Sequence, residues 1–294
     1  MSQYVPKEIT AEVNTTPVHP LVNFAHLLAT VAVIGGVLYV ALGFIASQLA
    51  VRIGPETEEK IGEALIATFP MQPVTEDSRV EYLRDLVNAL EAETANGTNG
   101  DRQYPPLKVK ILPTPEENAM VTAGSYLLVT EGLLSAVDSE NELAFVLAHE
   151  LGHLHHRDPL KALGRSLVFT TGLTVLGISP SNSVIPNVIN FAELRYGRGQ
   201  ETAADDYAIQ QIIRHYDHGS ESLNFFHRNR DLDFDGRVGE AFSTVLEWEQ
   251  THPLSSGRIA RLETQFEENG WATTGEITPL PEFIDCPNFE PCHQ

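Results

Sequence analysis

The sequence is poor in three features, and each scarcity excludes a class of protein. It has only 2 cysteines in 294 residues, so it is not a small fold held together by disulfides. Its 19 Lys and Arg are outnumbered by 40 Asp and Glu, giving a net charge of −21. We therefore expect no nucleic-acid partner, because a phosphate backbone requires clustered cations. Long apolar runs are also scarce, which argues against a transporter with many membrane spans.

One long apolar run is present near the amino terminus. Residues 24–51 contain no charged side chain, and the 20 residues from 27 to 46 are almost entirely apolar. A helix of this length, at about 1.5 Å per residue, crosses a hydrocarbon core of about 30 Å. A cleaved signal peptide usually has a cationic start and a shorter run, and a buried core helix is the other alternative. We expect a flexible tail at 1–23 and a single transmembrane anchor at 24–51.

Hydrophobic periodicity predicts an α+β, mostly helical domain over residues 55–270, followed by an irregular tail at 271–294. Helical spacing covers residues 55–69, 75–94, 132–137, 140–157 and 199–216, and strand-like runs cover 107–112, 118–122 and 125–130. The apolar stretch 167–178 has 12 residues, too few to span a bilayer. It remains open whether that stretch is a buried helix or dips into the membrane surface.

The most informative motif is His149-Glu150-Leu-Gly-His153, within the predicted helix 140–157. Two histidines at i and i+4 share one helix face, so both imidazoles can bind one metal ion. Glu150 lies at the edge of that face, where it can reach a water on the metal. Neutral imidazoles suit zinc, and a catalytic zinc has three protein ligands and one open position.

Glu201 is the candidate third ligand. It begins a predicted helix 48 residues after His153, with Asp205 one turn later on the same face. Asp205 could accept a hydrogen bond from the far nitrogen of a ligand histidine and so orient that ring. The alternative is a solvated acidic helix start, which the helix dipole favours.

Several segments together resemble the HtpX and CAAX-prenyl-protease family of membrane-associated zinc metallopeptidases. The matching segments are Asn118-Ala119, 125–134 (SYLLVTEGLL), 142–153 (ELAFVLAHELGH), 198–208 (RGQETAADDYA), Thr251-His252-Pro253 and Arg258-Ile259. The resemblance covers roughly residues 55–265, with the motifs in order. It implies a gluzincin fold, with a small β-sheet beside the His-Glu-x-x-His helix, and Glu201 as the third zinc ligand.

Two departures from that family are visible. HtpX-type and prenyl-protease members have extra membrane spans, whereas this chain has one credible span. It is therefore more similar to the branch with a soluble catalytic domain, which includes bacterial periplasmic quality-control peptidases and the mitochondrial Oma peptidase. Asp158 stands where members often have a histidine. Because this position follows the ligands, we expect it to have no effect on catalysis.

The implied reaction is hydrolysis of a peptide bond, with Glu150 as the general base and then the general acid. His252 and Arg258 are candidate donors to the oxyanion, and a purely structural role for both is equally open. His252 could also serve as a fourth ligand that displaces water and silences the enzyme. His155 and His156 are expected to cap the helix end rather than to bind metal.

We expect the substrates to be unfolded or damaged polypeptides, bound as extended strands along 125–130 or 118–122. An anchored zinc endopeptidase is the favoured function. The alternatives are a latent peptidase activated by stress or a partner, and a non-catalytic, chaperone-like module that binds peptides.

Two weaker patterns occur near the carboxyl terminus of the sequence. Asp231, Asp233 and Asp235 match the first half of a calcium-binding EF-hand loop, but its final glutamate is missing, so a solvated acidic turn is the favoured alternative. Cys286 and Cys292 would form a small disulfide in an oxidising compartment. This pair, the acidic composition and the family branch favour an extracytoplasmic catalytic domain, although the flanking cations are too few to settle the orientation.

Overall fold

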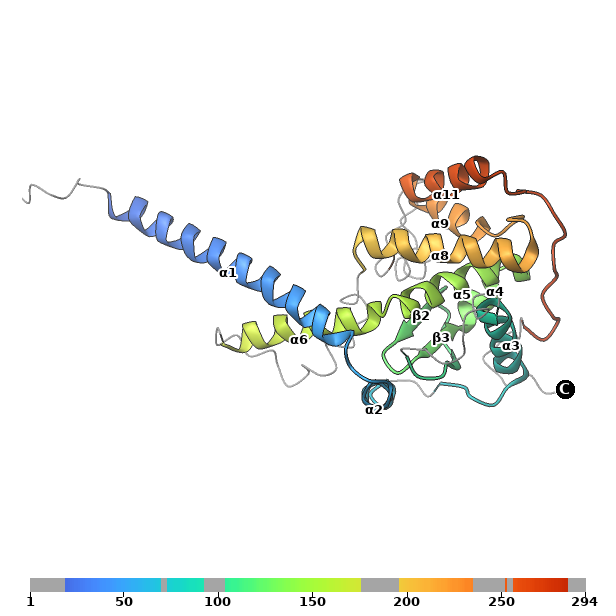
Figure 1. The fold of residues 1–294 in the computed structure, drawn as a ribbon, viewed down its shortest axis with the longest axis horizontal. Coiled ribbons are helices and arrows are strands. Elements are labelled where there is room, and N and C mark those ends of the chain that lie inside the picture. Colours follow the sequence, from blue (N-terminus) through green and yellow to red (C-terminus); the bar gives the residue numbers. More distant parts are fainter. Residues whose placement is uncertain are drawn as a thin grey trace, which may run out of the picture. The chain divides into compact units, whose positions relative to one another are not determined.

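The computed structural model describes residues 19–69, 73–92, 104–175, 196–234, 252 and 256–284. The chain divides into two compact units, Met1–Leu42 and Gly43–Gln294. The helices with the bounds seen here are α1 (Pro20–Ala50), α2 (Pro55–Ile66), α3 (Ser78–Ala92), α4 (Glu131–Ala136), α5 (Glu140–His155), α6 (Asp158–Val175), α8 (Arg198–Tyr216), α9 (Asn224–Phe234) and α11 (Ser256–Asn269). With one small sheet, they confirm the mostly helical α+β fold (Figure 1).

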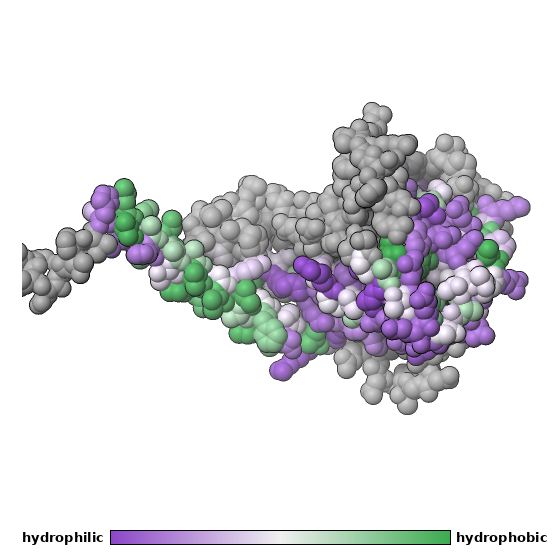
Figure 2. Space-filling view, turned by 90° about the horizontal axis from the view of Figure 1, so that it is seen from above, coloured by the Kyte–Doolittle hydropathy of each residue, from purple (hydrophilic) through white to green (hydrophobic). Residues whose placement is uncertain are grey.

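Helix α1 has the features of a membrane helix. It is 31 residues long, and in the described part of the chain it alone is long and apolar enough to cross a bilayer. Its large apolar side chains are exposed, including Leu27, Ile34 and Phe44. Figure 2 shows an apolar surface along much of this helix, whereas the described residues of the second unit visible in this view are mostly hydrophilic. Residues 1–18 of the predicted tail at 1–23 lie outside the described part of the chain.

The sheet has three strands in the order β1-β3-β2: β1 is Lys108–Leu112, β2 is Ala119–Thr122 and β3 is Tyr126–Thr130. Strand β3 pairs in parallel with β1 and antiparallel with β2. The expectation that 125–130 offers a free sheet edge is therefore wrong, because both edges of β3 are paired. Within the described residues, strand β2 lies at one edge of the sheet, beside helix α5.

Helix α5 lies between the sheet and α8 and forms the centre of the core (Figure 1). Its apolar residues Leu143, Phe145, Val146 and Leu147 are completely buried. Gly152, inside the His-Glu-Leu-Gly-His motif, allows α8 to approach closely: a Cβ at this position would lie 2.8 Å from the Cα of Ala204. This contact brings the histidines of α5 within reach of the acidic side chains of α8.

Helix α5 ends two residues earlier than predicted, and α6 begins almost at once. Arg157 adopts a positive φ of 57° between the two helices. Its guanidinium binds the Glu58 carboxylate and donates to the Ile53 carbonyl oxygen at 3.0 Å. Helix α6 has Pro159 in its first turn. It includes the apolar stretch predicted at 167–178 as far as Val175. Residues 176–178 lie outside the described part.

Candidate metal centre

Three parts of the chain supply the candidate site. Helix α5 carries His149, Glu150 and His153, helix α8 carries Glu201 and Asp205, and His252 precedes α11. All six side chains are buried, with at most 2% of any residue exposed. Burying so many ionisable groups is unfavourable unless they pair with each other or with a metal ion. The tertiary fold therefore gathers a polar cluster in its apolar core.

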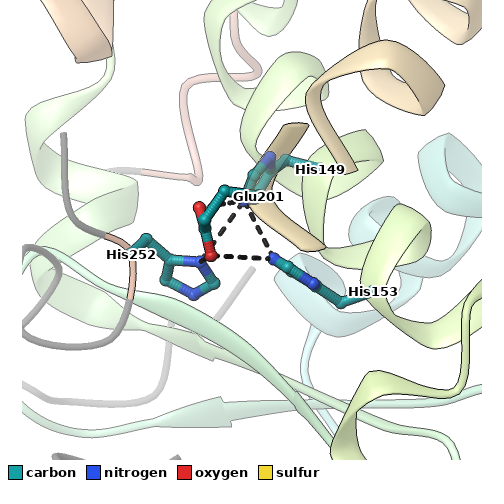
Figure 3. A group of neighbouring side chains, drawn as sticks. All are labelled: His149, His153, Glu201 and His252. Atoms are coloured by element: carbon teal, nitrogen blue, oxygen red, sulfur yellow. Dashed lines mark hydrogen bonds and ion pairs between the residues drawn. The ribbon is translucent and has the colours of Figure 1, made fainter. Parts of the chain in front are cut away.

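Four of these side chains point at one common position (Figure 3). The Nε2 atoms of His149 and His153 lie 3.2 Å apart, and each lies 3.5 Å from a carboxylate oxygen of Glu201. The Nδ1 atom of His252 lies 3.3 Å from His149 Nε2 and 3.2 Å from Glu201 Oε1. All four ligand atoms lie within 4.8 Å of one another.

These separations suit a tetrahedral metal ion. With metal–ligand bonds of about 2.0–2.1 Å, the ligand atoms of a tetrahedral zinc site are about 3.3 Å apart. The five distances of 3.2–3.5 Å, taken to one or the other oxygen of Glu201, fall around that value, and the four ligand atoms all lie within 4.8 Å of one another. Three imidazole nitrogens and one carboxylate oxygen also form a donor set typical of transition metals such as zinc. The arrangement can hold one metal ion.

Each histidine of the motif is oriented by a carboxylate on its far side. Asp205 Oδ1 lies 3.0 Å from His149 Nδ1, the contact expected from the sequence. Asp158 Oδ2 lies 3.0 Å from His153 Nδ1, so Asp158, for which no effect on catalysis was expected, contacts a motif histidine. Asp158 is completely buried and also binds Lys161 Nζ at 3.0 Å. Such partners fix the tautomer and the orientation of ligand imidazoles.

Replacing Asp158 with asparagine is expected to weaken metal binding about tenfold, the lower end of the range for residues that orient metal ligands. The neutral amide no longer favours the His153 tautomer whose Nε2 faces the metal. Zinc affinity measured by competition with a chelating dye checks this result. The matched control is Asp206→Asn, whose carboxylate pairs with Arg261 and lies 40% exposed. Equal zinc affinity in both variants would contradict a positioning role for Asp158.

Arg258 holds the carboxylates of α8 in place. Its guanidinium lies 2.6 Å from Glu201 Oε2 and 2.7 Å from Asp205 Oδ1. Burial lowers the pKa of Arg258, but its pairing with Asp205 and Glu201 outweighs burial and raises that pKa. Burial likewise raises the pKa of Asp205, yet hydrogen bonds from His149 and Arg258 lower it to about 2. Of the two roles left open for Arg258, these contacts support the structural one.

Glu150 lies beside the ligand cluster and not within it. Its Oε2 atom accepts a hydrogen bond from the backbone N–H of Val121 at 3.0 Å, which ties it to strand β2. Its Oε1 atom lies 3.3 Å from His252 Nε2. His252 therefore stands between Glu150 and the common position of the ligands, with one ring nitrogen facing each.

Tyr196 was not expected at the site. Its ring stacks on His153 with 3.9 Å between centroids and lies 5.4 Å from the His252 ring. It covers the cluster from the loop before α8, and only 7% of the residue is exposed. Burial raises the pKa of its hydroxyl, and so does the negative charge of Glu150, Asp158 and Glu201. No motif or residue spacing in the sequence indicates that Tyr196 reaches the metal centre.

The remaining sequence predictions lie away from this cluster. His156 caps α5 through its Nδ1 atom, 2.7 Å from the Gly152 carbonyl oxygen, as expected. Calcium gains no support, because Asp231 and Asp233 belong to helix α9 and Asp235 lies outside the described residues. Cys286 and Cys292 also lie outside them.

Comparison with known proteins assigns this chain to a family. The model of "Peptidase family M48" matches residues 84–265, more than half of the chain. The mitochondrial metalloendopeptidase OMA1 of Saccharomyces cerevisiae is 26% identical over 51% of this chain and 44% of its own length. A putative beta-barrel assembly-enhancing protease of Vibrio cholerae is 27% identical over 64% of this chain and 39% of its own.

A protease HtpX homolog of Salinibacter ruber is 25% identical over 66% of this chain and 78% of its own length. The chain spans less than half the length of the OMA1 and assembly-enhancing relatives. The matched segment contains the motif histidines, Glu201 and Arg258, which the fold brings together around one metal position. The chain belongs to peptidase family M48.

Proposed function

We propose that the chain is a membrane-anchored zinc endopeptidase that hydrolyses unfolded or damaged polypeptides. One observation carries this proposal: His149, His153 and Glu201 converge in a buried cluster, and the unligated carboxylate of Glu150 lies beside it. Both the family and the donor set favour zinc. The proposed domains are those of the sequence analysis: an anchor at 24–51 and a peptidase domain at 55–270.

In this proposal His149, His153 and Glu201 hold the zinc ion. When bound, zinc would polarise the scissile carbonyl and make a water molecule acidic enough to attack near neutral pH. Glu150 takes the proton from the attacking water and delivers it to the leaving amine. The hydrogen bond from the Val121 N–H holds one oxygen of Glu150 in place, and the other oxygen lies 3.3 Å from His252 Nε2. Asp205 and Asp158 orient the two imidazoles, and Arg258 holds Glu201.

Strand β2 is the proposed binding edge for an extended substrate. The Val121 contact shows that β2 runs directly beside Glu150. Main-chain pairing along such an edge tolerates many side chains, which suits a peptidase of unfolded proteins. The helix α1 would keep this activity at a membrane, and we propose that the catalytic domain faces the extracytoplasmic side.

A latent form of the same enzyme is the second candidate. The Nδ1 atom of His252 occupies a fourth corner of the ligand cluster, 3.2 Å from Glu201 Oε1. A catalytic zinc needs that corner for water or substrate. With His252 there and Tyr196 stacked on His153, the cluster is closed to substrate. Activation would then require His252 to leave this corner.

The proposed function is tested with the full-length chain in detergent, supplied with one equivalent of zinc. We expect cleavage of unfolded casein that stops with a chelator and returns when zinc is added. Cleavage that persists after complete removal of the metal would contradict a zinc peptidase. A chain that binds no zinc would contradict the metal centre itself.

Replacing His252 with alanine separates the active and latent forms. If His252 blocks the fourth corner, His252→Ala should cleave casein at least about tenfold faster than the wild type, with zinc still bound. Casein cleavage and zinc content per chain are measured together. The nearby variant His155→Ala is the control, because His155 stacks on Tyr207 outside the cluster. A His252→Ala variant that keeps its zinc but is slower than the wild type would contradict latency and favour a role for His252 in catalysis.

A further inference from the structure

The second half of helix α6 is unusual for a helix of this acidic chain. One fifth of all residues are charged, yet none occurs from 166 to 175, and none follows in the sequence until Glu193. The first half of α6 is different, since it contains Asp158, Lys161 and Arg165. Polarity therefore changes abruptly along a single helix.

An apolar side chain of this second half is left in contact with solvent. Leu167 is 55% exposed. Apart from residues of α1, the only other large hydrophobic residue that is exposed in the described part is Ile277, at 46%. One exposed leucine is ordinary on a protein surface, so its significance depends on the uncharged segment in which it lies.

The polar groups of the same segment are already satisfied within the helix. The hydroxyls of Thr170, Thr171 and Thr174 each donate to the carbonyl oxygen one turn earlier, at 2.7–2.9 Å. A hydroxyl bonded in this way needs no water, so a helix containing it can enter lipid at low cost. The three threonines therefore do not prevent burial in a bilayer.

The first half of α6 packs against the last turns of α1. A Cβ on Gly164 would lie 3.1 Å from the Ala46 carbonyl oxygen, and the Arg165 side chain lies 3.9 Å from the position of a Cβ on Gly43. Leu160 and Ala50 share one apolar cluster. Between residues 43 and 50, α1 and α6 thus run side by side in opposite directions.

The charges of α6 suit the headgroup layer of a membrane. Arg165 directly precedes the uncharged segment, and Lys161 lies one turn earlier, paired with Asp158, the only acidic residue of the helix. Long cationic side chains can lie along apolar surface while their charges stay at the interface. There they are attracted to anionic lipids. This order, cations and then an uncharged segment, is that of a helix entering a membrane.

We propose that residues 166–175 insert into the lipid bilayer, in the leaflet next to the catalytic domain. The ten described helical residues measure about 15 Å, roughly half of the hydrocarbon core, so they reach into one leaflet. Because α6 begins at Asp158, which binds His153, this insertion fixes the metal centre close to the membrane surface. The inference rests on the proposed anchoring by α1 and not on peptidase activity.

The test uses the full-length chain in vesicles of phosphatidylcholine and phosphatidylglycerol, with no other protein present. Cysteine is introduced singly at the exposed positions Leu167, Thr171 or Thr174, with Cys286 and Cys292 changed to serine. Each variant is labelled with nitrobenzoxadiazole, whose fluorescence is then quenched either by acyl-brominated lipids or by aqueous iodide. The control label is placed at Thr264, which is exposed on α11.

We expect the α6 labels to be quenched by brominated lipids and to show iodide quenching at least about fivefold weaker than the label at Thr264, because hydrocarbon excludes ions. Iodide quenching equal to that at Thr264 would overturn the proposal. Protection from both quenchers would overturn it too, since protein and not lipid would then cover the segment. Variants whose far-ultraviolet circular dichroism equals that of the wild type are taken as folded. The readout needs no catalysis, so an inactive peptidase leaves the test intact.

Discussion

Casein cleavage by Glu150→Gln is expected to be about 10³-fold slower than that of the unmodified chain, within the range for the loss of a general acid–base group. The amide has the same shape as the carboxylate and can still accept the hydrogen bond from Val121 N–H. It cannot take a proton from water. Zinc content should stay at one ion per chain, because Glu150 is not among the converging ligands.

Two comparisons make this result specific to Glu150. The first is Glu140→Gln on the same helix, whose side chain accepts hydrogen bonds from the hydroxyls of Tyr82 and Tyr216, away from the metal. It should retain cleavage within about twofold. The second repeats Glu150→Gln in the His252→Ala background, so that latency cannot hide the loss. Full cleavage by the double variant would exclude Glu150 as the base.

Glu201→Gln is expected to remove zinc from the protein. The carboxylate faces the Nε2 atoms of both motif histidines, and Arg258 holds its second oxygen at 2.6 Å. A neutral amide is a poor zinc ligand and cannot balance the charge of the metal. We expect zinc affinity to fall more than about 100-fold, beyond the effect of residues that only orient ligands.

Thermal unfolding gives a second readout for Glu201→Gln. Zinc at 100 times its Kd stabilises a folded protein by about 2.7 kcal/mol. The unmodified chain should therefore show a rise in Tm with zinc, and Glu201→Gln should show none at the same concentration. Thr202→Ala is the control, since the Thr202 hydroxyl donates to the Arg198 carbonyl oxygen away from the cluster. Retention of the zinc-dependent Tm rise by Glu201→Gln would show that another group is the third ligand.

Local sequence patterns were sufficient for helices α2, α3, α4, α5 and α8 and for the two motif histidines, but did not indicate α9 or α11. Helix α5 was predicted because its apolar residues recur at helical spacing, and the same spacing places His149 and His153 on one face. Strands β2 and β3 were predicted within one residue of their bounds. Their order was not predicted, because strand pairing depends on contacts that alternation within one strand does not reveal.

Asp158 shows what reasoning from spacing did not reveal. It lies five residues after His153, beyond the end of α5, and helical periodicity does not place such a residue near the ring. The chain turns at Arg157, which has a positive φ, and the Asp158 carboxylate lies beside His153 Nδ1 as a result. Tyr196 reaches the site from a loop, and its stacking on His153 has no signature in the sequence.

The amino-acid order alone therefore specified a metal-binding helix, an acidic second helix, an apolar anchor and a resemblance to a metallopeptidase family. These features depend on residues close together in the chain or on recognisable motifs. The tertiary structure decided which side chains meet at the metal position, with His252 opposite Glu201 and Asp158 behind His153. It did so because α5, α8 and the segment before α11 are distant in sequence, and only their packing around Gly152 and the buried core determines the distances between them.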